Sequence, residues 1–303
     1  MLPSIRTCQD FSELLTDDKL DALIIAVPAT LHYQLTKLAL NAGKHVLVEK
    51  PLALQTGEAE ELVRLAEQSG KTLMVGHTFL YNPAVRKMKD HVDRGTLGKI
   101  YYMQAARTHL GLIRTDVSAV WDLAPHDISI FNYLLGKQPL RVSAVGMAHL
   151  NPKFEDVAFL SLVYPDQILG NVHISWVDSN KQRQVAIIGS KARIFFDDLN
   201  LLERLRIFEK GVSLDRPYES FGEFQLLLRD GDIISPKIDP EEPLRNVCLE
   251  FVRCIRTGEK PLADGQNGLE LVRAMTAVQQ SIALGGAPVD LEVGVVKPVL
   301  QRP

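Results

Sequence analysis

The first hundred residues alternate short apolar runs with helical patterns. The apolar runs are typical of buried strands and lie at residues 22–27, 45–49 and 72–76. Helical spacing of apolar residues follows each run, at residues 30–42, 56–68 and 82–94, and each pattern stops near a glycine that can end a helix. Such alternation is the rhythm of parallel βαβ units, so we predict a parallel α/β sheet over residues 1–98.

Beyond residue 98 the pattern changes to a second, β-rich region. Strands are predicted at residues 100–106, 141–148, 158–163, 170–176, 184–188 and 192–196. Helices are predicted at residues 123–135, 242–256 and 268–284. We therefore expect a second domain, residues 99–303, with a large, mostly antiparallel open sheet, and C-terminal helices that can pack back on the first domain.

Composition excludes several classes of function. With 46% hydrophobic and 23% charged residues, the 303-residue chain can bury a substantial core. Its 34 basic and 37 acidic residues give a formal charge of −3 without a basic block, so we expect no nucleic-acid partner. No apolar run is long enough for a membrane span or a signal peptide, and we expect a cytoplasmic protein. Three scattered cysteines fit neither a disulfide framework nor a CxxC metal site.

Lys50 is the first candidate for chemistry. It ends the strand-like segment His45–Glu49 and precedes Pro51, which biases Lys50 toward an extended conformation. At a strand end, such a lysine can donate a hydrogen bond to a substrate hydroxyl or carbonyl and stabilise developing charge. The competing interpretation is a solvated loop lysine paired with Glu49, which an isolated Glu-Lys-Pro favours.

Asp122 and His126 form the second candidate pair. Asp122 is placed to cap a helix that starts at Leu123, which is its simplest role. His126 would then lie in the first turn, where the helix dipole keeps the imidazole neutral and able to accept a proton. The two residues share a helix face, but no third ligand lies nearby, so we expect no metal site. Taken alone, His126 is as well explained by a structural role as by a catalytic one.

His32 and His77 follow the ends of two predicted parallel strands, where a ligand crevice would form. Either can equally be a packed, half-exposed histidine. The chain contains no Gly-x-Ser-x-Gly elbow, Walker lysine motif or His-Glu-x-x-His. Serine hydrolase, P-loop enzyme and zincin classes are therefore disfavoured.

Several motifs in order resemble the Gfo/Idh/MocA oxidoreductase family. They are AVPATLH at residues 26–32, AGKHVLVEKPLA at 42–53, YNPA at 81–84 and DLAPHD at 122–127. The segments EPLR at 242–245 and DGQNGL at 264–269 also look like this family, particularly its sugar and sugar-nucleotide members. The similarity spans nearly the whole chain, and ordered motifs are more specific than any one of them alone.

The resemblance implies a Rossmann domain, an α+β substrate domain, NAD or NADP as cofactor, and a sugar or sugar nucleotide as substrate. It implies that Lys50 binds the reacting hydroxyl, that His126 is the general base or acid, and that Asp122 positions substrate or lysine. It also implies a homo-oligomer, dimer or tetramer, formed through the C-terminal sheet. Cofactor-lining positions are Pro28, Thr30, His32, Glu49 and Lys50, with His77 added by its strand-end position, and weaker substrate-side positions are Tyr81, Asn82 and Arg107.

One departure from the family pattern concerns the phosphate-binding turn. The first glycine is Gly43, and no G-x-G-x-x-G occurs, so we expect residues 1–98 to form a truncated Rossmann-like domain without the glycine-rich βαβ segment. Two alternatives to a dehydrogenase or ketoreductase stay open from the sequence. One is a non-catalytic or truncated relative without redox turnover, and the other is an NAD-dependent glycosidase.

Overall fold

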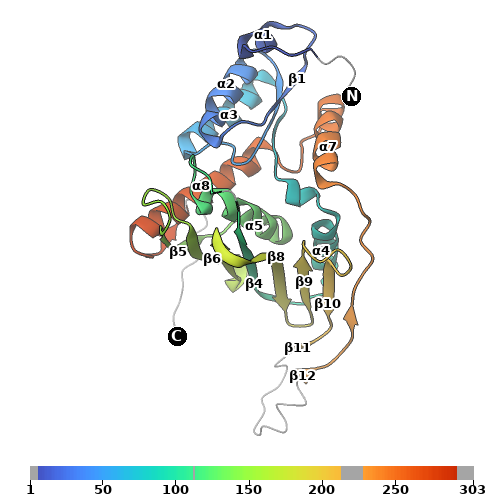
Figure 1. Ribbon diagram of the computed structural model, residues 1–303. Helices are drawn as coiled ribbons and strands as arrows, with labels where there is room; N and C mark the ends of the chain where they lie inside the picture. Colours follow the sequence, from blue (N-terminus) through green and yellow to red (C-terminus); the bar gives the residue numbers. More distant parts are fainter. Residues whose placement is uncertain (1–5, 112, 213–227, 292–303) are drawn as a thin grey trace. The chain divides into compact units, whose positions relative to one another are not determined.

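The computed structural model describes residues 6–111, 113–212 and 228–291 (Figure 1). The chain divides into two compact units. The first contains the residues up to His77 together with Arg245–Val272, and the second contains Thr78–Leu244 and the residues from Arg273 onward. No helix of the described ranges combines the length and the apolar character that crossing a membrane requires.

The first unit is built on a small parallel sheet of strand order β1-β2-β3. Its strands are β1 (Ala22–Ile25), β2 (His45–Val48) and β3 (Leu73–Val75). Its helical elements are α1 (Phe11–Thr16), η1 (Ala29–Leu31), α2 (His32–Asn41), α3 (Thr56–Ser69), most of α7 (Pro243–Thr257) and the beginning of α8 (Gly265–Ala283). The predicted strands and their parallel arrangement are thus confirmed.

Burial explains why these three segments form the sheet. Val46, Leu47 and Val48 of the central strand are all buried, as are the three residues of β3. In β1, Leu23 and Ile25 are buried whereas Ile24 is exposed, so this strand covers a core on one face only. Because the strands are parallel, the residues that follow them lie at a single edge of the sheet.

The second unit contains a nine-stranded sheet of order β13-β10-β9-β8-β4-β7-β6-β5-β14. The strands are β4 (Ile100–Leu110), β5 (Arg141–Met147), β6 (Val157–Val163), β7 (Leu169–Ser175), β8 (Val177–Gly189), β9 (Arg193–Asp197), β10 (Leu205–Phe208), β13 (Ile233–Ile234) and β14 (Val289–Asp290). The strands β11 (Gly211–Val212) and β12 (Leu228–Arg229) pair separately. Every neighbouring pair in the large sheet is antiparallel except β4 and β7, so the predicted mostly antiparallel sheet is confirmed.

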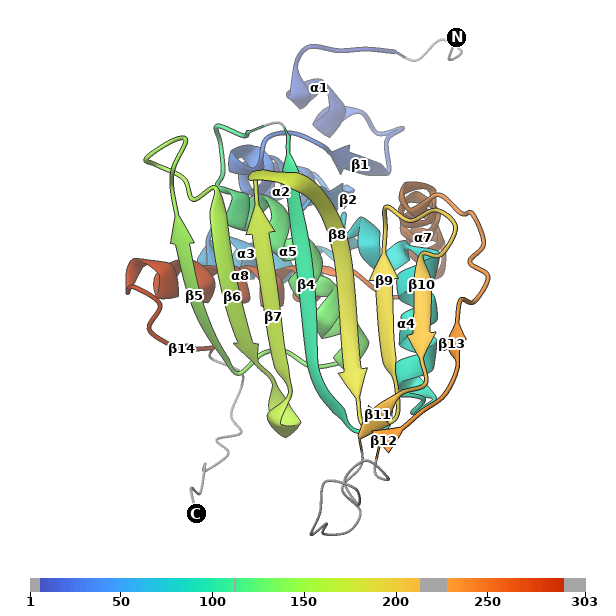
Figure 2. The ribbon, with the colours of Figure 1, turned by 60° about the horizontal axis from the view of Figure 1, so that its bottom comes forward.

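Helices cover one face of this sheet. The helical elements of the unit are η2 (Thr78–Tyr81), α4 (Pro83–Asp93), α5 (Ala119–Leu135), η3 (Pro165–Gln167) and the later part of α8 (Gly265–Ala283). Helix α5 contacts β4, β6 and β7, and α4 contacts β9, as Figure 2 shows. Met103, Leu160, Val172 and Ile194 are buried in this core. The opposite face carries exposed Tyr102, Val145, Phe159 and Leu169.

Helix α5 begins earlier than the sequence predicts. Ser118 occupies its N-cap position and the helix starts at Ala119, so the predicted start at Leu123 is wrong. Pro125, a residue that suits a first helical turn, lies inside the helix. Asp122 therefore belongs to the first turn and is not the helix cap.

Candidate functional site

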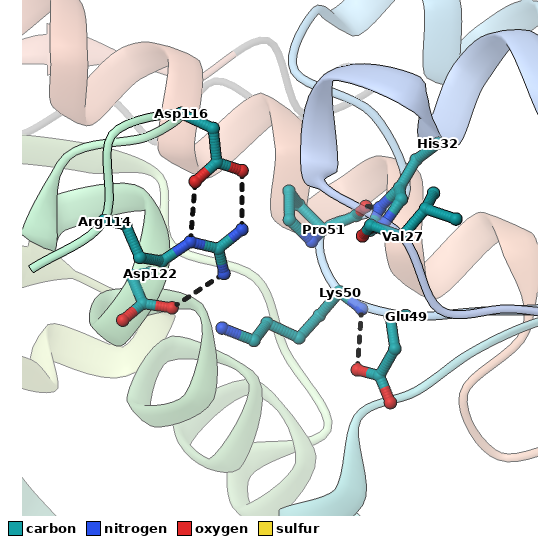
Figure 3. Close-up of polar contacts among 8 residues, drawn as sticks. All are labelled: Val27, His32, Glu49, Lys50, Pro51, Arg114, Asp116 and Asp122. Atoms are coloured by element: carbon teal, nitrogen blue, oxygen red, sulfur yellow. Dashed lines mark hydrogen bonds and ion pairs between the residues drawn. The ribbon is translucent and has the colours of Figure 1, made fainter. Parts of the chain in front are cut away.

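Lys50 lies in the loop that leaves the central strand of the first unit. Its backbone N–H donates to Oε2 of Glu49 at 3.3 Å, and its side chain is half-buried (Figure 3). A Cβ at Gly76 would lie 3.1 Å from the carboxyl carbon and one oxygen of Glu49. Gly76, at the end of β3, therefore leaves the room that the Glu49 carboxylate needs beside the Lys50 loop.

His32 connects the ends of the first two strands. Its Nδ1 is 2.6 Å from the carbonyl oxygen of Pro51, and its Nε2 is 2.9 Å from that of Val27, while the ring is almost completely buried. Both partners are acceptors, and a neutral imidazole can donate to only one of them at a time. The ring thus holds the loop of Lys50 against the end of β1, and direct contact of His32 with a cofactor stays a prediction.

His77 is buried at the end of β3. Neither ring nitrogen has a hydrogen-bond partner within the described ranges, and burial, followed by the charge of Lys50, lowers the pKa of His77 to about 4. The ring is therefore neutral near pH 7 and offers one donor and one acceptor. A carboxamide presents the same complementary pair of groups. Pro28 and Thr30, by contrast, are exposed in the turn after β1.

In the second unit, helix α5 places Asp122 and His126 one turn apart on one helix face. Oδ1 of Asp122 accepts a hydrogen bond from Nη1 of Arg114 at 3.3 Å. Arg114 also donates to Asp116 through Nε at 2.9 Å and Nη2 at 2.6 Å (Figure 3). The bond to Asp116 is the main cause that raises the pKa of Arg114, so a permanent positive charge anchors the Asp122 carboxylate.

His126 lies more than one turn from the start of α5, because the helix begins at Ala119. The predicted first-turn position of His126 is therefore wrong. The field of the helix dipole falls off within the first turn, so it acts only weakly on this ring. The ring of Phe79 packs against the imidazole, with 5.2 Å between the two ring centroids.

The three weaker substrate-side candidates are all buried. Arg107 donates to Asp127 through Nε at 3.0 Å and Nη2 at 2.8 Å, and its guanidinium carbon lies 4.4 Å from the centroid of Phe79. Asn82 caps α4 by accepting from the N–H of Ala84 at 2.9 Å, and it donates to Asp198 at 3.3 Å. Tyr81 lies beneath Arg86. Substrate contact by these three side chains stays a prediction.

Sequence reasoning missed Arg114, Asp116 and Asp127. Arg114 and Asp116 lie in the connection between β4 and α5, which carries no motif of its own. Asp127 was visible in the segment that includes His126, but its buried partner Arg107 lies on another element. Within the described ranges, no three His, Cys, Asp or Glu side chains are arranged to hold a metal ion.

A parallel sheet with polar groups at its strand ends, together with an α+β unit that carries an Asp–His pair, is the architecture of an oxidoreductase with a Rossmann-type unit. Residues 2–77 match the family described as "Oxidoreductase family, NAD-binding Rossmann fold", and residues 85–195 match the "GFO/IDH/MocA C-terminal domain". The chain belongs to the GFO/IDH/MocA family of oxidoreductases.

Relatives extend this similarity over almost the whole chain. The NAD⁺-dependent scyllo-inositol 2-dehydrogenase of Bacillus subtilis is 28% identical over 302 residues, covering 94% of this chain and 82% of the relative. UDP-N-acetylglucosamine 3-dehydrogenase of Acidithiobacillus ferrooxidans is 25% identical over 265 residues, covering 87% and 79%. An inositol dehydrogenase homologue from Azotobacter vinelandii, solved with NADH and myo-inositol, superposes with a TM-score of 0.75 at 20% identity, covering 92% and 80%.

The first unit fits one part of the family's cofactor. The buried nitrogens of His77, which have no hydrogen-bond partner in the part of the chain that the structure describes, suit the nicotinamide end of a dinucleotide, as do the polar groups at the ends of β2 and β3. The sequence offers no G-x-G-x-x-G for the pyrophosphate. The strand ends of this chain thus offer hydrogen-bond donors and acceptors for the nicotinamide end of NAD, the cofactor that the family binds.

Proposed function

We propose that the chain is a dehydrogenase or ketoreductase that transfers hydride between NAD or NADP and a carbon of a sugar or sugar nucleotide. The observation that carries the proposal is the Asp122–His126 pair on α5, with Asp122 anchored by Arg114. The named activities of the inositol and UDP-N-acetylglucosamine relatives support a polyhydroxylated substrate.

Each of the three proposed catalytic residues has a separate task. The nicotinamide ring accepts or supplies the hydride when the cofactor is bound. Nζ of Lys50 donates a hydrogen bond to the reacting oxygen and stabilises the negative charge that develops on it. His126 takes the hydroxyl proton during oxidation and returns it during reduction. Asp122, held in place by its ion pair with Arg114, accepts hydrogen bonds from substrate hydroxyls and orients them.

No observation favours the two alternatives. An NAD-dependent glycosidase would use the same transient oxidation, but the named relatives are dehydrogenases. A non-catalytic relative would show no NAD(P)-dependent turnover of any substrate, which distinguishes it from the proposed enzyme. The cytoplasmic location stays a prediction.

We further propose that a second copy of the chain covers the helix-free face of the large sheet. Val145, Phe159 and His173 form one row across β5, β6 and β7, and the rings of Phe159 and His173 stack at 4.4 Å. Tyr102 and Leu169 are paired in the neighbouring strands β4 and β7 and are also exposed. An apolar surface of this kind is typical of an interface between subunits.

Calorimetric titration of the folded chain with NADH and with NADPH tests the cofactor, followed by a screen of polyols and sugar nucleotides for NAD(P)-dependent turnover. We expect micromolar binding of at least one cofactor and turnover of at least one polyhydroxylated substrate. Absence of binding to a chain shown by circular dichroism to be folded would contradict the proposal. Release of a glycosidic leaving group without net cofactor reduction would assign the glycosidase activity instead.

A further inference from the structure

We propose that Phe79, held in place by the buried Arg107–Asp127 ion pair, is a positioning residue for the imidazole of His126. The inference rests on the proposed function, in which His126 exchanges the proton. All four residues belong to the second unit. Neither the motifs of the sequence nor the proposed mechanism gives Phe79 or Asp127 a task.

The ion pair provides the fixed point. The side chains of Arg107 and Asp127 are 4% and 0% exposed, and two parallel hydrogen bonds join them. A bidentate pair fixes the plane of the guanidinium as well as its distance from the carboxylate. Since Arg107 lies on β4 and Asp127 on α5, the pair also fixes the rotation of α5 about its axis relative to the sheet.

Phe79 transmits this geometry to His126. One side of the contact is the Arg107 guanidinium, whose carbon lies 4.4 Å from the ring centroid. The other is the His126 ring, at 5.2 Å between centroids and 67° between planes, which is an edge-to-face arrangement. Phe79 is therefore held between a fixed cation and the imidazole.

The backbone around Phe79 is also anchored. Phe79 lies in η2, and Asn82, the residue before α4, caps that helix with its side chain. Nε of Arg86 donates to the carbonyl oxygen of Leu80 at 3.0 Å. The aromatic ring is thus attached to a short segment with little freedom to move, so it can restrict the rotation of the imidazole.

A buried ion pair is a poor source of stability, because the cost of desolvating both charges offsets most of their attraction. Geometric specificity is the better explanation for such a pair when it lies one contact away from a proton-transferring group. Proton transfer depends on the direction of the ring nitrogen, and a small misplacement is enough to slow it.

Phe79→Leu tests the proposal, with Phe79→Tyr as the conservative variant and Phe196→Leu as the matched control. Phe196 is a buried phenylalanine of β9 in the same unit that is given no part in the site. We expect Phe79→Leu to lower kcat about tenfold or more, with KM changed less than about twofold and a displaced midpoint in the pH profile of kcat. Phe79→Tyr should restore most of the rate, and Phe196→Leu should lower Tm while kcat stays close to wild type.

A second measurement separates this inference from the proposed function. In protein labelled with ¹³C-histidine, the His126 signal is assigned by its absence in His126→Gln. Removal of the Phe79 ring should shift this signal and move its titration midpoint, whereas Phe196→Leu should do neither. If both changes occur but the wild type turns over no polyol, the positioning stands and the proposed function fails. If Phe79→Leu and Phe196→Leu behave alike in kcat, pH profile and the His126 signal, the inference is overturned.

Discussion

His126 and Asp127 are neighbours on α5, and their side chains have different surroundings and different roles. His126 is partly accessible, whereas Asp127 is fully buried. Successive helical residues point in different directions, so one can face a reactant while the next binds Arg107 inside the unit. Only the partly accessible one can exchange a proton with a substrate.

His126→Ala should therefore lower kcat by about 10²- to 10⁴-fold, the range that general acid–base groups supply, while the Kd for NADH changes little. His91→Ala is the matched control, since it removes a histidine from the end of α4 in the same unit. Steady-state kinetics and calorimetry measure the two effects. An unchanged kcat in His126→Ala would remove this residue from the mechanism.

Lys50→Met should lower kcat at least as strongly as it raises KM, by about 10²-fold or more, because the lost donor acts on charge that develops in the transition state. Lys50→Arg keeps the charge but changes its geometry and should recover only part of the rate. Kinetics indistinguishable from wild type in Lys50→Met would return this residue to the role of a solvated loop lysine.

His77 predicts a pH dependence of stability. Its pKa is about 4 in the folded chain and 6.5 as the ordinary value, so the unfolded state binds more protons between these values. The free energy of unfolding should fall as pH drops from 6.5 toward 4, by an amount on the order of 3 kcal/mol. Urea unfolding of wild type and His77→Phe at several pH values measures this, and the variant should show a flatter dependence. Parallel curves for the two proteins would contradict the assignment.

Candidate reactive residues could be predicted from the sequence, but the partners that surround them could not. Lys50, Asp122 and His126 were found because a strand end and a short motif mark them. Arg107, Tyr81 and Asn82 are buried because they bind partners on other elements or cap a helix, and no local pattern reveals such partners.

Among the secondary-structure elements, segments with a clear apolar run or period were predicted, whereas several short segments without one were missed. Helices α3, α4, α7 and α8 and strands β4 to β9 follow their hydrophobic patterns. Strands β10, β13 and β14 and helix α1 were not predicted, because so few residues show no clear period. A two-residue strand such as β14 is defined by its pairing with β5, which is a property of the folded chain.

The buried His32 side chain links two elements, because its ring nitrogens contact the carbonyl groups of Val27 after β1 and Pro51 after β2. His32→Phe should lower the free energy of unfolding by about 1–3 kcal/mol, since it leaves a carbonyl group at the strand ends without its donor. Gln34→Ala, an exposed change in the same helix, should have little effect. Denaturant unfolding compares the two variants, and equal stabilities would show that the ring does not support the Lys50 loop.

For the whole molecule, the main prediction concerns association. Phe159→Glu places a charge at the centre of the helix-free sheet face and should convert an oligomer to a monomer, because an unpaired charge is costly to bury in an interface. Leu202→Glu is the control, since Leu202 is 95% exposed and lies outside the sheet. Light scattering after size-exclusion chromatography gives the mass. A monomeric wild type, or an oligomer that persists in Phe159→Glu, would contradict the proposed interface.

The architecture of both units was predictable, because strand–helix alternation and β-rich composition each correspond to few arrangements. The strand order of the large sheet was not. The parallel pairing of β4 with β7 and the position of β8 beside β4 depend on long-range contacts that periodicity does not encode.

The anchoring of His126 also bears on how such a protein can be diversified. The residues that position the imidazole are Phe79 of η2, Arg107 of β4 and Asp127 of α5. Arg114 and Asp116, by contrast, belong to the connecting segment before α5. Libraries that vary residues 113–117 would therefore alter the charges around Asp122 and leave the contacts that position the His126 ring unchanged. The contacts of the His126 ring and the charged partners of Asp122 thus belong to different segments, which makes residues 113–117 a suitable place to vary substrate choice.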